Sequence, residues 1–470
     1  MNHTQLAQLE QLHADAASIF NHALKTCDIP GAFDRHLHFE GKTLLRSPSP
    51  LVKPVPIALE KYKRIVVISL GKAALTMLDA LLERLPPKML HRGVCSAPVL
   101  PKKRNWRIRY FAGGHPLPNE ASFAAAREAL KVLKHAGKDT FIFFLISGGG
   151  SAMMELPSDP EISLDDAIAF HETLIASGAS ITEINTVRKY FSAVKAGRLA
   201  MAAPDAGKLT LLLADVPLKD LAAVASSPTL PDRTTPQECL EVLRRFHLLE
   251  KFPQAVREYF EGLHLDSPKA HAETPEEQRA FANAQFDTLL SNHDFVNAAR
   301  DHAQSLGYKV MIDNSCDDWD YRDASAYLLK RFHELRREFP RLCLLSSGEV
   351  TVAIDGPSGC GGRNQQFALA SAFELAGYER EPLVVLSAGS DGIDGNSPAA
   401  GAIADPTTVK RAREFGFDPA ATLARFDTCP LFTALGDTIV TGPTGNNLRD
   451  LRIMLSSGPA TSVPTAAEML

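Results

Sequence analysis

The sequence has few of the features that mark a secreted, membrane-bound or nucleic-acid-binding protein. Its seven cysteines are scattered without a Cys-x-x-Cys pair, which argues against a disulfide framework and against a zinc site. No apolar run approaches the roughly 20 residues of a membrane span, and the N-terminus lacks a basic start and an apolar signal core. With 50 basic and 55 acidic residues, the chain offers no basic stripe for nucleic acid. We therefore expect a cytoplasmic protein that binds neither nucleic acid nor a membrane.

The composition that remains is typical of a globular protein of enzyme size. Hydrophobic residues make up 45% of the 470 residues and charged residues 22%. This length exceeds one ordinary hydrophobic core, so we expect two domains, residues 1–338 and 339–470. Helical spacing predicts a helix over residues 6–24, and residues 29–56 are expected to form an irregular connection. Strands that alternate with helices predict an α/β fold with a doubly wound parallel sheet.

The most informative segment is the apolar run Phe141–Ile146 with the turn that follows it. Six apolar residues without alternation favour a strand covered on both faces of a parallel sheet. Three glycines then permit a sharp turn and open backbone N–H groups to an anion, although a tight turn without a ligand is the alternative. If a helix opens at Ser151, its positive end favours phosphate. The residues expected to contact phosphate here are Ser147, Gly148, Gly149, Gly150 and Ser151.

A second strand with a glycine at its end precedes this segment. Residues 64–69 form an apolar run, followed by Gly71 and Lys72 at the start of an apolar helix. The arrangement is similar to phosphate-binding turns, but it is not a Walker A loop, because the first glycine and the Ser or Thr after the lysine are missing. Lys72 is therefore a candidate phosphate ligand, with a solvated helix residue as the alternative.

Two further groups of polar residues surround the central segment. His115 lies in the Gly-Gly-His-Pro turn, where it could be a ligand, an acid–base group or a residue that only holds the loop. A short stretch after residue 180 is dense in cations and suits an anionic ligand, although part of it must be a solvated helix face. Its members are Asn185, Arg188, Lys189, Lys195 and Arg198.

Asp215 follows the apolar strand Lys208–Ala214 directly. Ligands of open α/β sheets bind at the carboxyl ends of the strands, which makes Asp215 a candidate site residue. An aspartate that caps the next helix is the competing interpretation.

The second half of the chain combines apolar strands with loops rich in glycine and aspartate. Strands are expected at residues 342–347, 350–354 and 383–387, and the first two meet near Glu349. A glycine-rich loop then leads through Arg363 into a helix. The turn after residue 387 holds Asp391 and is too rich in Asp and Gly to pack as core.

Taken together, these motifs resemble the class II glycerate kinases (glycerate 2-kinases), which combine a DUF4147 N-terminal domain with a C-terminal MOFRL domain. The resemblance runs from about Arg64 to Leu455 through ordered blocks. These blocks are LGKAA, GGHPLP, LISGGGSA, INTVRK, ADVP, SGEVTV, GGRNQQFALA, GSDGIDG and GDTIVTGPTGNN.

The resemblance implies a Rossmann-like N-terminal domain and a smaller α/β domain, with the active site in a cleft between them. It also implies that the protein phosphorylates D-glycerate to 2-phosphoglycerate, with ATP as the phosphoryl donor and Mg2+ as the metal ion. It implies catalytic roles for Lys72, Asp215 and Arg363. Glu349 and Asp391 are candidate Mg2+ ligands, because both offer hard oxygen donors. The nucleotide-binding set comprises Gly71, Ser147, Gly148, Gly149, Gly150, Ser151, Asn185, Arg188 and Lys189.

The sequence departs from the family pattern at a few positions. Members commonly have glycine where this chain has Ala196, and glycine again at Ser227 in the loop Ser226–Thr229. Near Asp215 the family usually reads Gly-Asp where Leu218-Lys219 stands here, and Asn446 replaces a threonine.

Two other functions are weighed against the kinase. An NAD(P)H-dependent hydroxypyruvate reductase would carry G-x-G-x-x-G after a first strand, and that place holds Leu70–Leu75 with a single glycine. A non-catalytic protein that binds a nucleotide or sugar acid is the third class, because a fold does not guarantee activity. The sequence does not determine the oligomeric state, and a homodimer is one of the alternatives.

Overall fold

The computed structural model describes residues 2–47, 53–214, 224–263, 274–354 and 356–457, arranged in two compact units. Unit 2 is continuous and spans residues 29–291, whereas unit 1 combines residues 1–28 with residues 292–470. The sequence-based boundary at 338/339 differs from this division. Residues 292–338 and the N-terminal helix contribute packing surface to the sheet of unit 1, which a linear reading of the sequence does not reveal.

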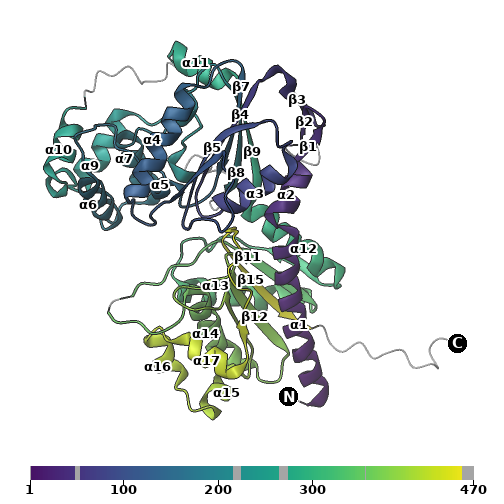
Figure 1. Ribbon diagram of the computed structural model, residues 1–470. Coiled ribbons are helices and arrows are strands. Elements are labelled where there is room, and N and C mark those ends of the chain that lie inside the picture. The colour runs from purple at the N-terminus through teal and green to yellow at the C-terminus, as the bar shows by residue number, and fades with distance from the viewer. Residues whose placement is uncertain (1, 48–52, 215–223, 264–273, 355, 458–470) are drawn as a thin grey trace. The chain divides into compact units, whose positions relative to one another are not determined.

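Unit 2 is built on a six-stranded sheet in which all neighbouring strands are parallel (Figure 1). Its spatial order corresponds to 3-2-1-4-5-6 in chain order, which is the order of the doubly wound dinucleotide-binding folds. The switch point, where the strand order reverses, falls between β4 and β7. From one edge to the other the strands are β6 (Ile108–Ala112), β5 (Leu90–Ala97), β4 (Arg64–Leu70), β7 (Thr140–Ile146), β8 (Gly207–Ala214) and β9 (Ala284–Ser291).

Strand β7 confirms the prediction made from its apolar run. All seven of its residues are buried, because helices cover both faces of the sheet. Each large apolar side chain buried in this way contributes about 1.5–3 kcal/mol. In the parallel register Leu70 of β4 lies beside Ile146 of β7, so the turns after the two strands are neighbours.

Helices pack on both faces of this sheet. α3 (Ala74–Arg84) follows β4, and α4 (Glu120–Lys134) packs on β5 and β6 with its alanine-rich face in the core of the sheet. Asn119 begins α4 as a capping residue, since its side chain accepts a hydrogen bond from the Ser122 backbone. The other helices of unit 2 are α2 (Ile29–His36), α5 (Gly150–Met153), α6 (Leu164–Ile175), α7 (Ile181–Phe191), α8 (Arg198–Met201), α9 (Pro236–Arg245), α10 (Gln254–Glu261) and α11 (Pro275–Ala282), with short 3-10 turns η1 (Leu59–Lys61) and η3 (Leu249–Lys251).

The expected irregular connection at residues 29–56 is wrong for most of its length. This stretch contains α2 and the first strands of an antiparallel sheet in the order β1-β2-β3. The strands are β1 (Leu37–Glu40), β2 (Thr43–Arg46) and β3 (Val55–Ala58). Four residues are too few to display a clear alternation, and pairing between neighbours decides the structure.

Unit 1 carries a mixed six-stranded sheet in the order β10-β11-β15-β12-β13-β14. Only β10 and β11 pair in parallel. The strands are β10 (Lys309–Ile312), β11 (Leu342–Ser347), β12 (Leu383–Gly389), β13 (Gly401–Ala404), β14 (Thr438–Ile439) and β15 (Asp450–Ser456). The helices are α1 (His3–Thr26), α12 (Asn292–Ser305), α13 (Tyr321–Glu338), α14 (Arg363–Leu375), α15 (Thr408–Glu414), α16 (Pro419–Ala424) and α17 (Thr428–Leu435), with the 3-10 turn η4 (Ala376–Tyr378).

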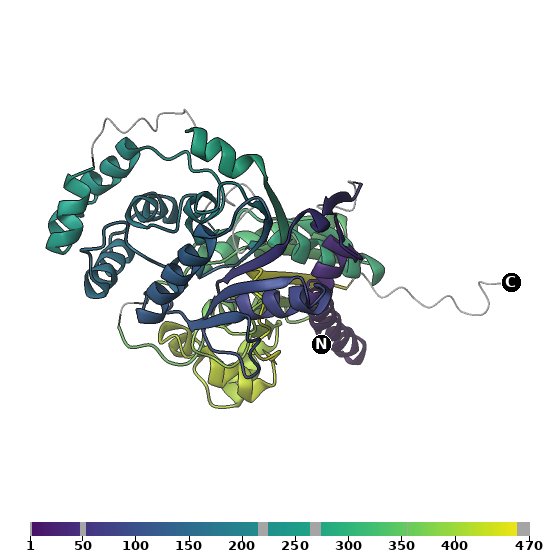
Figure 2. The ribbon, with the colours of Figure 1, turned by 45° about the horizontal axis from the view of Figure 1, so that its top comes forward.

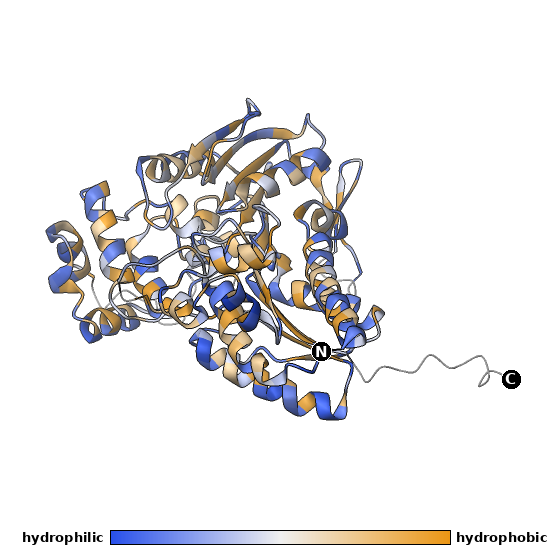
Figure 3. Cartoon of the chain, turned by 90° about the horizontal axis from the view of Figure 1, so that it is seen from below, coloured by the Kyte–Doolittle hydropathy of each residue, from blue (hydrophilic) through white to orange (hydrophobic). Residues whose placement is uncertain are grey.

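Helix α1 confirms the amphipathic helix predicted at residues 6–24. It lies at the start of the chain but packs in unit 1, together with residues from 292 onwards. It packs on α12, where the Phe20 and Phe295 rings meet edge to face at 5.9 Å. Helices with one apolar and one polar face surround strands that are largely apolar (Figure 3). Within the described ranges, no helix is both long enough and apolar enough to cross a bilayer.

The strand expected at residues 350–354 is not present. Gly348 turns the chain with φ +126°, and Thr351 forms only an isolated bridge with Asp320. Val350 is buried, but Ile354 is 49% exposed, so the stretch has an apolar composition without a pairing partner along its length.

Candidate active site

The turns after β4 and β7 are joined at the switch point of the unit 2 sheet, whose strands are drawn in blue to teal in Figure 2. The Lys72 N–H donates to the Gly148 carbonyl at 2.8 Å, and the Ala73 N–H donates to Ser147 Oγ at 3.1 Å. Gly71 has φ +115°, and a Cβ atom there would lie 2.3 Å from Ser147 Oγ. Only glycine permits this approach. The two glycine turns predicted separately thus form one structure.

Gly149 lies between two basic side chains. Its φ is +78°, and a Cβ atom built on it would lie 3.0 Å from Cδ2 of His115 and 3.1 Å from Cγ of Lys72. Because glycine has no side chain, the space between His115 and Lys72 is left to a ligand that can approach the backbone. Gly149 also precedes α5, which begins at Gly150. That helix is shorter than the helical opening expected over Ser151–Glu155.

Positive charge is concentrated around Gly149. Burial lowers the pKa of His115, and the neighbouring Lys72 and Arg188 lower it further. The pKa of Arg188 is lowered by burial too, against the attraction of Glu155, and its Nε is buried without a hydrogen-bond partner. Lys72 is exposed. Lys72 and Arg188 therefore supply positive charge for a phosphate group, and the neutral imidazole of His115 supplies a hydrogen bond.

A chain of hydroxyl and amide groups lies next to this cluster. The side chains of Ser151 and Ser226 are within 3.2 Å of each other, and Ser226 Oγ donates to Asn185 Oδ1 at 3.0 Å. Asn185 and Ser226 are both buried. The structure therefore links the predicted residues Ser151 and Asn185 through Ser226, which the sequence did not single out as a ligand.

The remaining cations of the predicted cluster have structural partners. Lys189 Nζ donates to Asp232 at 2.9 Å, and Arg198 donates to the Ser192 carbonyl at 2.9 Å. Lys195 is fully buried and donates to the Glu155 carboxylate. Arg188 is the member whose charge reaches His115.

Sequence reasoning missed a buried charge network centred on Glu155. Its carboxylate contacts Lys195 and lies 3.1 Å from Nε2 of His171, and the exposed fraction of all three side chains is 2% or less. Burial alone would raise the pKa of Glu155, but Lys195 and His171 lower it to about 2. Burial lowers the pKa of His171 to about 4. Only the pairing of residues far apart in sequence brings these groups together, although the cation-dense stretch already included Lys195.

The predicted catalytic residues Asp215 and Arg363 lie outside the part of unit 2 that the structure describes. Asp215 lies outside the described residues. Arg363 begins α14 in unit 1, where its guanidinium donates to both carboxylate oxygens of Asp450 at 2.6 and 3.0 Å and lies 3.0 Å from Glu349. Burial opposes the charge of Arg363, but Asp450 and Glu349 hold its pKa above the ordinary value. The two-pronged geometry expected of Arg363 is present and directed at protein carboxylates.

The predicted metal ligands Glu349 and Asp391 both contact protein groups. Glu349 contacts Arg363, and Asp391 accepts a hydrogen bond from the Ile393 N–H at 3.1 Å. Among the described residues, no group of three or more His, Cys, Asp or Glu side chains is arranged to hold a metal ion. These carboxylates therefore do not form an all-protein cage for Mg2+, which in kinases is held by one or two carboxylates together with substrate phosphates.

The fold and the site define the class of this protein. It is a mixed α/β protein whose parallel sheet places two glycine turns, a histidine and cations at a topological switch point, where such folds bind ligands.

Comparison with known proteins identifies the family. Residues 15–261 match a domain of unknown function, DUF4147, and residues 342–450 match the MOFRL family. The chain is 36% identical over 397 residues to the glycerate 2-kinase of Pyrococcus horikoshii, covering 83% of this chain and 87% of that one. It is 35% identical over 404 residues to a putative hydroxypyruvate reductase of Agrobacterium vitis, covering 83% and 87%. The crystal structure of a glycerate kinase from Thermotoga maritima superposes with a TM-score of 0.78 at 29% identity, covering 95% of this chain and 100% of that one. The protein belongs to the glycerate kinase family with DUF4147 and MOFRL domains.

Proposed function

We propose that this protein transfers the γ-phosphoryl group of ATP to D-glycerate and forms 2-phosphoglycerate. Lys72 and His115 flank the Gly149 backbone and the charge of Arg188 reaches His115, and this arrangement carries the proposal. Phosphoryl transfer requires positioned donors and cations more than covalent chemistry, because negative charge spreads over the transferred group. The kinase names of several relatives give independent support.

The roles follow from the chemistry of each group. The backbone N–H groups at Gly148–Gly150 and the Ser151 hydroxyl hold nucleotide phosphates, and Lys72 neutralises charge on the transferring group. Asp215 orients or deprotonates the acceptor hydroxyl. Arg363 grips the substrate carboxylate or a phosphate once it is released from Asp450. Glu349 and Asp391 would hold Mg2+ together with the substrate phosphates, and the ion would supply positive charge to the transferred group.

A specific observation favours reduction of hydroxypyruvate as the second candidate. The strand order is that of dinucleotide-binding folds, and two relatives are named putative hydroxypyruvate reductases. Against it, the turn after β4 has only Gly71, and G-x-G-x-x-G is absent there. A binding protein without catalysis is the third class.

One experiment separates the three functions. Purified protein is incubated with ATP, Mg2+ and D-glycerate while ADP release is followed by a coupled assay, and phosphorus NMR identifies the product. Parallel reactions contain NADH or NADPH with hydroxypyruvate. We expect glycerate-dependent ADP release and a resonance of 2-phosphoglycerate. Oxidation of NADH or NADPH without ADP release would support the reductase, and no turnover in either reaction would support a binding protein.

A further inference from the structure

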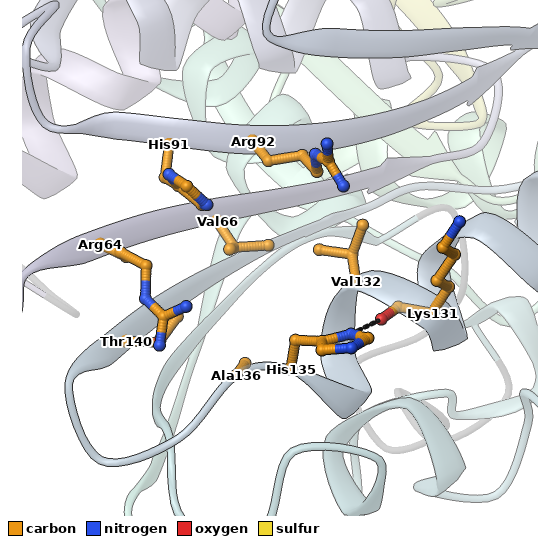
Figure 4. Close-up of a pocket in the computed structure, with 9 residues that line it drawn as sticks. All are labelled: Arg64, Val66, His91, Arg92, Lys131, Val132, His135, Ala136 and Thr140. Carbon is orange, nitrogen blue, oxygen red and sulfur yellow. Dashed lines mark hydrogen bonds between the residues drawn. The ribbon is translucent and has the colours of Figure 1, made fainter.

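A basic pocket lies at the end of the unit 2 sheet opposite the glycine turns. Its volume is about 270 Å3, and it opens between the beginnings of β4, β5 and β7 and the end of α4 (Figure 4). Five of the nine lining residues are basic, and none is acidic. The lining residues are Arg64, Val66, His91, Arg92, Lys131, Val132, His135, Ala136 and Thr140.

A bulge in β5 supplies two of the basic side chains. Ile65 pairs with Leu90, and the next residue, Val66, pairs with Arg92, so His91 is an extra residue in the strand. Both His91 and Arg92 are exposed, although alternation along a regular strand would place them on opposite faces. Bulges redirect side chains in this way and are frequent beside functional sites.

The pocket concentrates positive charge on a protein whose net charge is −5. Burial lowers the pKa of His91, and Arg64, Arg92 and Arg107 lower it further by repulsion. Arg64 donates to Asp139, an acid outside the lining, at 2.6 Å, while its Nε is buried without a hydrogen-bond partner. The local excess of cations and this unsatisfied donor both favour a negatively charged ligand.

The ring of His135 is held in place at the opposite wall. Its Nδ1 lies 2.7 Å from the Lys131 carbonyl, a contact drawn as a dashed line in Figure 4. The Lys131 carbonyl belongs to the last turn of α4 and carries a partial negative charge that would repel an anion. The contact with His135 offsets that charge. The apolar side chains of Val66 and Val132 lie between the basic groups.

The basic pocket is separate from the candidate active site. β4 runs from Arg64 to Leu70 and β7 from Thr140 to Ile146, so each strand begins at the pocket and ends at a glycine turn. Seven residues at about 3.3 Å each place the two sites about 20 Å apart. A small ligand cannot occupy both.

We propose that the basic pocket binds a small polyanion of the phosphate-ester or pyrophosphate type, as a second ligand site of this protein. Arg64 and Arg92 provide planar donors that suit phosphate oxygens, and Lys131 adds a third charge. The volume is sufficient for a small anion and below the range of drug-sized ligands. The proposal does not depend on the reaction at the glycine turns.

Calorimetric titration with pyrophosphate tests the proposal in the full-length protein. Lys72→Ala serves as the background, because it weakens phosphate binding at the glycine turns. In this background we expect a saturable binding event that weakens at least tenfold when Arg92→Ala and Lys131→Ala are added, which corresponds to about 1.4 kcal/mol. Both residues are exposed, and thermal melts verify that the variants fold.

The matched control adds Lys134→Ala and Lys138→Ala to the same background. These two lysines are exposed, lie outside the lining, and change the net charge by the same amount. The control must bind pyrophosphate clearly more tightly than the pocket variant, since neither of its lysines lines the pocket. Absence of saturable binding in the Lys72→Ala protein, or equal weakening in the pocket variant and the control, would overturn the proposal.

Discussion

Gly149 shows how one residue without a side chain organises the candidate site. A Cβ atom at this position would fill the space between Lys72 and His115 and would strain the backbone at φ +78°. The two basic side chains come from segments far apart in sequence, and the turn brings them to the same backbone. The capacity to bind a phosphate therefore depends on Lys72 and His115 lying together at Gly149, and none of the three residues would provide it alone.

Lys72 is the residue whose role is most directly testable. Lys72→Ala is expected to lower kcat by about two to four powers of ten, comparable to the loss of a preorganised electrostatic donor. Stability should be unchanged, because the side chain is exposed. Steady-state kinetics and thermal melts measure both effects, with the exposed Lys134→Ala as control. Turnover close to that of wild type would make Lys72 a solvated helix residue.

His171 predicts how stability depends on pH. Its folded-state pKa is lowered to about 4, below the ordinary value of 6.5, so on acidification the unfolded chain takes up a proton before the folded protein does. The free energy of unfolding should therefore fall as the pH decreases from 6.5 to 4. Glu155, with its pKa lowered to about 2 from 4.5, removes further stability as the pH falls from 4.5 to 2.

His171→Gln should reduce this pH dependence without abolishing it, because glutamine does not titrate while His333, whose pKa is also lowered to about 4, still does. Urea denaturation at several values between pH 7 and 4 gives the slope for each protein. His38→Gln is the control, since the His38 side chain is 72% exposed. An unchanged slope in His171→Gln would show that another group governs acid sensitivity in this range.

At the scale of elements, two loops next to the site adopt a strained conformation. Ala196, Ala225, Ser226 and Ser227 all have φ between +49° and +57°, a region that favours glycine. The loops pair through the Ala196 N–H to the Ser226 carbonyl at 3.1 Å and the Gly197 N–H to the Ser227 carbonyl at 2.7 Å. Ala196 and Ser227 are the positions where the resemblance leads us to expect glycine, and the positive φ at both positions fits that expectation.

Ser227→Gly and Ala196→Gly should therefore stabilise the protein. We expect each to raise the free energy of unfolding by about 0.5 to 1 kcal/mol, the relief of a left-handed conformation minus the entropy cost of glycine. Urea denaturation with an unchanged m-value measures this. Ala124→Gly within α4 is the control and should destabilise by about 1 kcal/mol. Destabilisation in all three variants would contradict the strain argument.

At the scale of the whole molecule, local patterns predicted the elements better than their assembly. The apolar run of β7 and the glycines after β4 and β7 were sufficient to predict the strands and the turns, because chain geometry and burial determine both locally. The contact of Glu155 with His171 and Lys195 depends on pairing across 40 residues. The packing of α1 on α12 brings residues 3–26 against residues 292–305, and no periodicity indicates such a partner.

The most direct test of the account compares nucleotides as stabilising ligands of the intact protein. A ligand that binds only the folded state raises the melting temperature by mass action. We predict that ATP with Mg2+ raises the melting temperature of wild type, that Lys72→Ala reduces this increase, and that NADH and NADPH produce none. A clear increase with NADPH and none with ATP would contradict the kinase assignment of the glycine turns.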